Sequence, residues 1–249
     1  MAKFLDQVAV VTGASSGIGK AIALELAAEG AKVCLVGRKK ESLDAVAKST
    51  QPSEQQMFCY QVDLTLDDAV GELAKRVQRE FGFVDLVVHG AGAIARGWFA
   101  EAPVEDLDWQ YRINVRAPYV LTQSLLPMLK SRQGQIVFLN SRVALLNAGV
   151  HSVQYAATKH ALKSMADSLR EEINPLGMRV LTVFLGRTAT PMQSMIHDIE
   201  RRPYCPERLV QPVDVAGIVL AALKLPRTAE VTDISIKPLP NHPKPGALG

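Results

Sequence analysis

Short apolar segments alternate with segments of helical periodicity along almost the whole chain. The apolar segments span residues 8–11, 33–36, 57–62, 84–88, 136–139, 179–184 and 231–236, and most of them are continuously apolar. Such runs are typical of strands buried on both faces, as in a parallel sheet covered by helices. The repeated order of strand and helix therefore predicts an α/β fold of the doubly wound Rossmann type, with about seven parallel strands and helices on both faces.

Helices are expected at residues 18–30, 40–49, 66–80, 104–130, 153–174 and 212–223. The helix at 104–130 contains Pro118 and Pro127, which are expected to kink or break it. No shift in composition and no linker divides the chain, so residues 1–249 are interpreted as a single domain for dinucleotide binding and catalysis. Residues 237–249 hold four prolines and are expected to form an extended tail.

Composition argues against several classes of protein. The net charge is only +3 and aromatic residues make up 6%, so neither a basic stripe nor a set of stacking platforms for nucleic acid is indicated. Asp6 lies where a signal peptide would be apolar, and no apolar run approaches the ~20 residues of a membrane span. We expect a cytoplasmic protein that binds neither nucleic acid nor membrane, and no spacing of histidines or cysteines indicates a metal site.

A glycine-rich turn, residues 12–19, joins the first strand to the first helix. Glycines allow a tight turn and a close approach of the backbone to a pyrophosphate, whose charge then faces the N–H groups of the helix. An ordinary glycine-rich turn is the alternative, and the position between a buried strand and an amphipathic helix favours phosphate binding. A dinucleotide is favoured over a nucleoside triphosphate because Lys20 is followed by Ala21, without the hydroxyl of a P-loop.

Tyr155 and Lys159 are one helical turn apart and therefore project from the same helix face. A free phenol has a pKa near ~10, and a neighbouring ammonium is expected to lower it. Tyr155 would then exchange a proton with a carbonyl or hydroxyl group. Ser141, just after a predicted strand, is placed to hydrogen-bond the same oxygen. A solvated surface pair is the alternative for an isolated tyrosine and lysine.

The pattern Thr12-Gly13-x-x-x-Gly17-x-Gly19, together with Tyr155-x-x-x-Lys159, resembles the short-chain dehydrogenase/reductase family from Val8 to about Ile236. The resemblance implies catalytic roles for Asn114, Ser141, Tyr155 and Lys159, with Asn114 holding a water that links Lys159 to solvent. The cofactor-binding residues that we expect are Gly13, Ser15, Ser16, Gly17, Ile18, Gly19, Arg38, Asp63, Leu64, Gly90, Ala91, Gly92, Tyr155, Lys159, Gly186 and Thr188.

The chain departs from this family's pattern at three places. The Asn-Asn-Ala-Gly segment is replaced by residues 89–92, His-Gly-Ala-Gly, which is expected to loosen a hydrogen bond near the adenosine. Leu185 replaces the proline of a Pro-Gly-x-x-x-Thr segment that ends at Thr190, and the usual Gly-Gly near the last strand is absent. None of these changes removes a proton-transfer group.

Residues after the second strand bear on the choice of cofactor. Gly37 stands where NAD-binding folds carry an acid for the ribose hydroxyls, and Arg38 follows it, which suits the 2′-phosphate of NADP. Lys39 or Lys40 would add a second charge, although a solvated basic cluster is the alternative. Asp63 is either a partner of the adenine amino group, by the resemblance, or a residue of a turn.

Three loops are expected on the substrate side, at residues 93–99, 142–153 and 187–209. Their apolar side chains that could line a substrate site are Trp98, Phe99, Met192, Met195, Ile196 and Tyr204. They also carry Arg96, Arg142 and Arg187, which either receive an anionic group or are solvated.

The resulting interpretation is an NADP(H)-dependent oxidoreductase that interconverts a carbonyl and a secondary alcohol on small molecules, with Tyr155 as general acid and base. A non-catalytic dinucleotide-binding regulator is the alternative. A dehydratase or epimerase is disfavoured because the long C-terminal substrate domain of such relatives is missing. The family resemblance also implies a homo-oligomer, most simply a tetramer.

Overall fold

The computed structural model describes residues 3–49, 56–146 and 151–239, and its centre is a single sheet of seven parallel strands. The strand order is β3-β2-β1-β4-β5-β6-β7, which confirms the predicted doubly wound α/β fold. The strands are β1 (Val8–Thr12), β2 (Lys32–Gly37), β3 (Met57–Gln61), β4 (Leu86–His89), β5 (Gln135–Ser141), β6 (Arg179–Leu185) and β7 (Asp233–Ile236).

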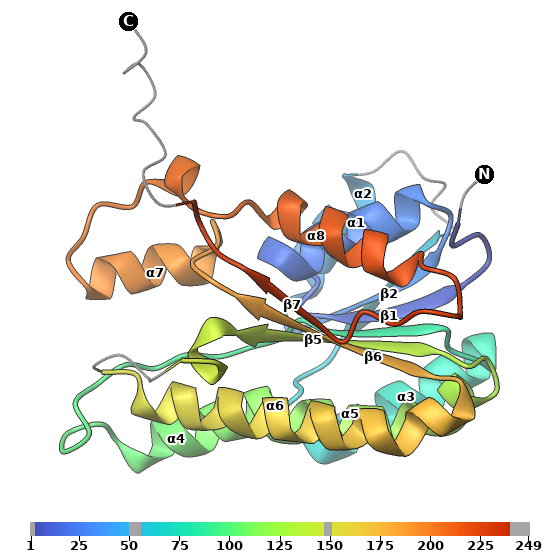
Figure 1. Cartoon of the computed structure of the whole chain (residues 1–249), viewed down its shortest axis with the longest axis horizontal. Coiled ribbons are helices and arrows are strands. Elements are labelled where there is room, and N and C mark those ends of the chain that lie inside the picture. The colour runs from blue at the N-terminus through green and yellow to red at the C-terminus, as the bar shows by residue number, and fades with distance from the viewer. Residues whose placement is uncertain (1–2, 50–55, 147–150, 240–249) are drawn as a thin grey trace, which may run out of the picture.

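Helices cover both faces of the sheet (Figure 1). One layer contains α1 (Gly17–Ala28), α2 (Lys40–Lys48) and α8 (Pro212–Leu223), and the opposite layer contains α3 (Asp67–Phe81), α4 (Val104–Tyr111), α5 (Ala117–Lys130) and α6 (Val153–Ile173). Alternate residues of each strand enter the two layers: in β1, Ala9 and Val11 pack toward α1 and α8, whereas Val8 and Val10 pack toward α3 and α5. A strand buried on both faces must be apolar throughout, which explains its sequence.

The helix expected at 104–130 is helical throughout, but its hydrogen-bonding pattern changes in the middle. Between α4 and α5 lies a π-helical segment, η2 (Arg112–Arg116). Pro118 has no N–H for the carbonyl of Asn114 four residues earlier, so the ordinary α-helical hydrogen bond cannot form there. Pro127 lies inside α5 without ending it. The expected disturbance is therefore found beside Pro118, and no break follows Pro127.

The segment 187–209, expected to be a loop, contains a helix, α7 (Pro191–Ile199). The Thr190 hydroxyl caps it by accepting a hydrogen bond from Gln193 N at 3.2 Å, and Pro191 occupies its first turn. Met192, Met195, Ile196 and Ile199 follow helical spacing, so the signal was present but was masked by the short length of the helix.

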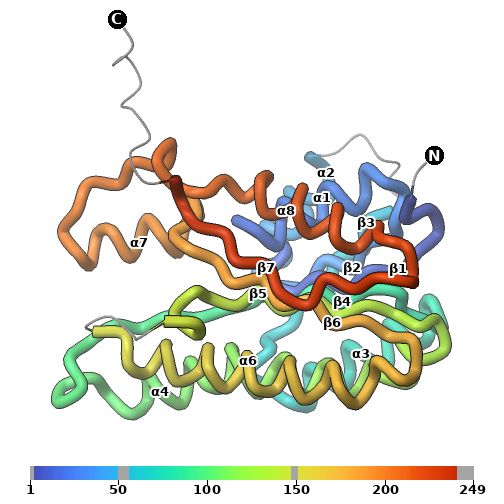
Figure 2. Tube along the Cα trace, viewed as in Figure 1, coloured from blue at the N-terminus to red at the C-terminus, as the bar shows by residue number. Residues whose placement is uncertain are grey.

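The carboxyl ends of the strands gather at one end of the molecule, where α7 and α4 lie on opposite sides of the sheet (Figure 2). The strand order reverses between β1 and β4, because β2 and β3 lie to one side of β1 and β5 to β7 lie beyond β4. In doubly wound sheets ligands bind in the crevice at this switch point. Within the described ranges, no helix has the length and apolar character required to cross a membrane.

Two minor expectations fall partly outside the described residues. The proposed tail at 237–249 is described only to Leu239, and residues 237–239 have no regular secondary structure. The loop expected at 142–153 includes residues 147–150, which also lie outside the described ranges.

Candidate active site

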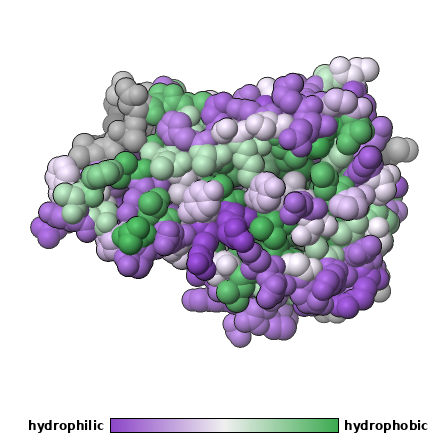
Figure 3. Space-filling model, turned by 90° about the horizontal axis from the view of Figure 1, so that it is seen from below, coloured by the Kyte–Doolittle hydropathy of each residue, from purple (hydrophilic) through white to green (hydrophobic). Residues whose placement is uncertain are grey.

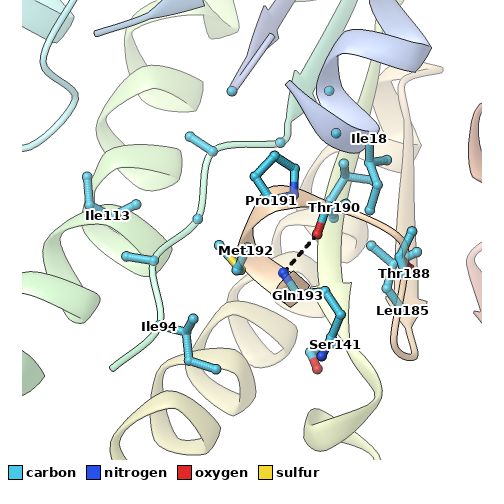
Figure 4. Close-up of a pocket in the computed structure, with 18 of the residues that line it drawn as sticks. Ile18, Ile94, Ile113, Ser141, Leu185, Thr188, Thr190, Pro191, Met192 and Gln193 are labelled. Carbon is cyan, nitrogen blue, oxygen red and sulfur yellow. Dashed lines mark hydrogen bonds between the residues drawn. The ribbon is translucent and has the colours of Figure 1, made fainter. Parts of the chain in front are cut away.

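A cleft of about 510 Å³ opens at the carboxyl edge of the sheet. It is lined by the segments that follow β1, β2, β4, β5 and β6, and by residues of α6 and α7. Figure 4 shows Ile18 of α1, Ile94 after β4, Ser141 at the end of β5 and Met192 of α7 around the same space. A volume of this size is in the usual range for small-molecule and cofactor sites.

The glycine-rich turn forms one wall of the cleft. Gly13 and Gly17 have φ values of 66° and 56°, in the left-handed region that favours glycine. Helix α1 follows with Ser16 as its N-cap residue, yet no side chain caps its first N–H groups and no acidic residue lies in its first turn. The positive end of the helix dipole is therefore not neutralised and faces the cleft, which fits an anionic phosphate.

Thr12 connects this turn to the segment after β4. Its hydroxyl accepts hydrogen bonds from the N–H groups of Gly90 and Ala91, at 3.0 and 3.1 Å, and donates to Val88 O at 3.3 Å. A Cβ atom at Gly90 would lie 2.6 Å from the Thr12 carbonyl oxygen. Glycine at position 90, a departure from the family's asparagine, is thus required by the close approach of two backbones.

His89, the other departure in this segment, is buried in the core. Its Nε2 atom lies 2.8 Å from the Thr122 hydroxyl and its ring stacks on Phe138 with 4.8 Å between centroids. Burial lowers the pKa of His89 to about 3, so the ring is neutral. We therefore assign His89 a packing role beneath the site.

Asn114 lies in the π-helical segment and is buried. Its side-chain oxygen accepts a hydrogen bond from Ala93 N at 2.8 Å, and its amide donates to Ala93 O at 2.9 Å and to the Thr158 hydroxyl at 3.0 Å. Asn114 therefore ties the segment after β4 to helix α6. It does not line the cleft directly, whereas its neighbour Ile113 does.

Tyr155 and Lys159 project from α6 into the cleft, one helical turn apart. The Lys159 Nζ atom is 5.7 Å from the centroid of the Tyr155 ring and donates a hydrogen bond to Leu139 O at 3.2 Å. Ser141 hydrogen-bonds the Tyr155 hydroxyl, and its own Oγ accepts a hydrogen bond from Val143 N at 3.3 Å. The three side chains expected to handle the proton therefore meet at one place.

The electrostatics of this group differ from the expectation. Burial raises the pKa of Tyr155 to about 12, and the Ser141 hydrogen bond offsets only part of that rise. Burial also lowers the pKa of Lys159 to about 8. The expected lowering of the phenol pKa by Lys159 is thus wrong for the protein by itself, because removal from water outweighs an ammonium almost 6 Å from the ring.

Most of the predicted cofactor residues line the cleft. The exception is Asp63. Asp63 is exposed, and its carboxylate accepts hydrogen bonds from Thr65 N at 2.9 Å and from the Thr65 hydroxyl at 2.7 Å, which matches its interpretation as a turn residue. The predicted cofactor residues that line the cleft are Gly13, Ser15, Ser16, Gly17, Ile18, Gly19, Arg38, Leu64, Gly90, Ala91, Gly92, Tyr155, Lys159, Gly186 and Thr188.

The substrate side of the cleft is partly different from the expectation. Met192 and Ile196 line it, but the other predicted wall residues, Trp98, Phe99, Met195 and Tyr204, do not. Two lining residues outside the expected loops were missed, Trp109 of α4 and Ile113 of η2. Within the expected loops, the sequence did not single out Ile94, Thr190, Pro191 and Gln193 as wall residues, and these also line the cleft.

Three arginines surround the carboxylate of Glu200, just beyond α7. Arg187 Nη2 lies 2.8 Å from both of its oxygens, Arg96 pairs with Oε1, and Arg202 lies 3.6 Å from Oε2. The guanidinium groups of Arg187 and Arg96 help to hold the pKa of Glu200 below its usual range, against the effect of burial. This cluster joins the segments after β4 and β6 to the end of α7.

A model of the short chain dehydrogenase family matches residues 7–200. An uncharacterized oxidoreductase of Staphylococcus aureus strain USA300 is 33% identical over 96% of this chain and 100% of that protein. An alcohol dehydrogenase from the archaeon Thermococcus sibiricus, solved with 5-hydroxy-NADP, has a TM-score of 0.84 and 27% identity over 96% of this chain and 99% of its own. A short chain dehydrogenase from Burkholderia cenocepacia, solved with NADP, has a TM-score of 0.82 and 31% identity over 94% of this chain and 97% of its own.

The chain therefore belongs to the short-chain dehydrogenase/reductase family of oxidoreductases, which confirms the resemblance read from its motifs.

Proposed function

We propose that the protein is an NADP(H)-dependent oxidoreductase that interconverts a carbonyl group and a secondary alcohol. The observation that carries this proposal is the convergence of Tyr155, Ser141 and Lys159 at the end of a cleft whose other wall is the open N-terminus of α1. A site of this kind combines a place for a phosphate with a proton donor. Two solved relatives contain NADP or its 5-hydroxy derivative, which supports the cofactor class.

The proposed roles follow from the contacts. The turn from Gly13 to Gly19 would hold the pyrophosphate, and Thr188 is a candidate contact for the carboxamide. When bound, the reduced nicotinamide supplies the hydride for the carbonyl carbon. Tyr155 donates its proton to the carbonyl oxygen, Ser141 hydrogen-bonds that oxygen, and Lys159 stabilises the phenolate that remains.

Preference for NADP(H) rests on the end of β2. Gly37 is buried and brings no carboxylate to the cleft, while the exposed Arg38 lines it. Arginine presents a permanent charge and a planar fork that matches a phosphate. Lys40 is a weaker candidate for a second contact because its ammonium is 2.9 Å from the Asp44 carboxylate. Lys39 is exposed and does not line the cleft.

The proposal is tested by a panel of ketones and aldehydes assayed with NADPH and with NADH, in the wild-type protein and in Tyr155→Phe. The phenylalanine ring keeps the packing but has no transferable proton, so kcat is expected to fall by roughly 10²–10⁴-fold. Nucleotide affinity, measured by fluorescence titration, should change little. A Tyr155→Phe protein with near-normal turnover would disprove the mechanism.

A regulator that binds a dinucleotide without turnover remains the second candidate, since fold alone does not separate the two. Tight binding of NADPH with no oxidation of it by any member of the panel would favour this alternative. The buried Lys159 and the Tyr155–Ser141 hydrogen bond favour the enzyme, because a binding protein has no need for them.

We also propose a cytoplasmic homotetramer made of single-domain chains. Cys34, Cys59 and Cys205 are free thiols, which supports a reducing setting. Exposed and partly buried apolar side chains on α5 and α6 support association between copies of the chain, including Tyr119, Val120 and Met165.

A further inference from the structure

The cleft is lined by cationic side chains without any acidic one. Among its lining residues in the described part of the chain are Arg38, Arg96, Arg142, Lys159 and Arg187, and none is aspartate or glutamate. Arg38 lies at the end assigned to the adenosine, and Lys159 is beside Tyr155. Three arginines remain on the substrate side, which is more positive charge than proton transfer requires.

One carboxylate, that of Glu200, is shared among several of these guanidinium groups. Arg187 and Arg96 contact it from inside the cleft, and Arg202 contacts it from the exposed surface. Glu200 holds Arg187 through Nη2 alone, and Arg187 Nη1 is buried with no hydrogen-bond partner. A buried charged donor without a partner is unfavourable. The Arg187 side chain as a whole is 37% exposed and lines the cleft, so a small rotation of the guanidinium would pair it with an anion there.

Arg142 provides a second guanidinium group on the substrate side of the cleft. It directly follows Ser141, is partly buried and lines the cleft. Its backbone oxygen accepts a hydrogen bond from Leu145 N at 2.9 Å, and among the described residues its side chain forms no salt bridge. Replacing Arg142 would therefore break no ion pair among the described residues, so the effect of the variant can be attributed to the loss of its contact with the substrate.

The strand order separates these arginines from the place of the pyrophosphate. The phosphate turn follows β1, whereas Arg142 follows β5 and Arg187 follows β6, two and three strands away. With neighbouring strands ~4.8 Å apart, the separations at the sheet edge are about 10 and about 14 Å. The adenosine end, marked by Arg38 after β2, lies on the other side of β1.

Apolar residues form the remaining wall on this side, with Ile94, Ile113 and Met192 facing the space shown in Figure 4. A ligand that fits both this apolar wall and the arginines has an apolar body and a single anionic end. Arginine binds carboxylates through two parallel hydrogen bonds, which fixes orientation as well as affinity.

We propose that the substrate is an oxo acid, or the matching hydroxy acid, whose carboxylate is bound by Arg142 and Arg187 while its carbonyl oxygen meets Ser141 and Tyr155. This inference rests on the proposed function, because it assigns a substrate class to the same site. The carboxylate of such a substrate would serve as the counter-ion for the positively charged side chains on the substrate side of the cleft.

The test uses oxo acids with one to four carbons between carbonyl and carboxylate, each paired with its methyl ester, and NADPH as cofactor. In the wild type the best acid should exceed its ester in kcat/KM by about ten- to a hundredfold, the range expected from a charge-assisted hydrogen bond. Arg142→Gln should remove most of this advantage, because it raises the KM of the acid far more than the KM of its ester. Arg187→Gln should do the same, although it also loses the contact with Glu200.

Arg202→Gln is the matched control. It removes one positive charge and one contact to Glu200, but Arg202 is exposed and does not line the cleft, so the preference for acids should persist. NADPH affinity is measured for every variant. Equal efficiency with acids and esters in the wild type overturns the inference, as does a loss in Arg142→Gln that appears in NADPH affinity instead of in the KM of the acid.

A binding measurement keeps the inference separate from the proposed function. Benzoate and benzamide are titrated into the protein saturated with NADP⁺, with no turnover required. Benzoate should bind at least tenfold more tightly in the wild type and lose that advantage in Arg142→Gln. If esters and simple ketones are reduced but benzoate and the acids have no advantage, the proposed function survives and this inference fails. If no carbonyl compound is reduced, the proposed function fails and the titration alone decides this inference.

Discussion

The ammonium group of Lys159 is largely shielded from water in the folded protein. Its side chain is buried and has one hydrogen bond, to Leu139 O, while no acidic partner is found among the described residues. Burial lowers the pKa of its ammonium from 10.5 to about 8. Since one pKa unit corresponds to 1.36 kcal/mol, the charged form costs roughly 3 kcal/mol of folding free energy as an upper bound. A residue kept at such a cost is typical of an active site.

Lys159→Met should therefore stabilise the protein at pH 7 while it removes activity. The gain is partly offset by about 1 kcal/mol, because Leu139 O loses its hydrogen bond, so a rise in Tm of a few degrees is expected. The cost of the wild-type charge is fully present below the folded pKa of about 8 and disappears above the unfolded pKa of 10.5. The advantage of Lys159→Met should shrink between these two pH values.

Lys163→Met is the matched control for this prediction. Lys163 lies one turn further along α6, remains partly in contact with water, and pairs with Asp167 at 2.6 Å. Its replacement should give no stabilisation. A Lys159→Met protein that unfolds at a lower temperature than the wild type at pH 7, by calorimetry, would contradict the argument.

At the residue scale, sequence patterns could predict which side chains meet but not their energetics. The spacing of Tyr155 and Lys159 and the position of Ser141 after a strand, taken together with the family resemblance, placed them in one group, and all three line the cleft. The raised pKa of Tyr155 was not predictable, because it depends on how completely surrounding elements exclude water. The requirement for Gly90 likewise follows only from the distance between its backbone and that of Thr12.

At the scale of elements, the strands were predictable because burial on both faces leaves a strong apolar signal. Most boundaries agree with the structure to within two residues. Helix α7 was missed because nine residues provide only two turns of periodicity between segments of mixed character. The π-helical segment that places Asn114 was also not predictable, since Pro118 indicates a disturbance but not its form.

The turn between β2 and α2 provides a prediction about the cofactor. Gly37→Asp/Arg38→Leu should shift preference toward NAD(H), because it adds a carboxylate for ribose hydroxyls and removes the proposed phosphate partner. A Cβ atom at Gly37 would lie 3.2 Å from the Leu43 side chain and 3.7 Å from the Ser15 hydroxyl oxygen, so a small shift of the Leu43 side chain accommodates it. The ratio of kcat/KM for NADPH to that for NADH should fall by about ten- to a hundredfold.

Lys39→Gln is the control for this exchange, since it removes a charge from the adjacent position, which does not line the cleft. Its cofactor preference should stay close to that of the wild type. Equal use of both cofactors by the wild type, or an unchanged ratio in the double variant, would show that Arg38 does not recognise the phosphate.

At the scale of the whole molecule, the face formed by α3 to α6 carries apolar side chains that its own sheet does not cover. Figure 3 looks onto this face and shows hydrophobic patches between hydrophilic ones. On α5, Ala117 and Leu121 are buried in the chain's own core, whereas Val120 on α5 and Met165 and Leu169 on α6 are only partly buried. Tyr119 on α5 is 54% exposed. A twofold contact between two such faces would bury these side chains in a closed assembly.

The expected species is a tetramer of four 27.1 kDa chains, about 108 kDa, when light scattering is measured at micromolar concentration. Tyr119→Glu should shift the distribution toward smaller species, because burying an unpaired carboxylate in an apolar contact is unfavourable. Leu5→Glu is the control, since Leu5 is 64% exposed in the turn before β1, away from α5 and α6. A wild-type protein whose measured mass is that of a single 27.1 kDa chain would contradict the prediction that these apolar side chains form an interface between copies of the chain.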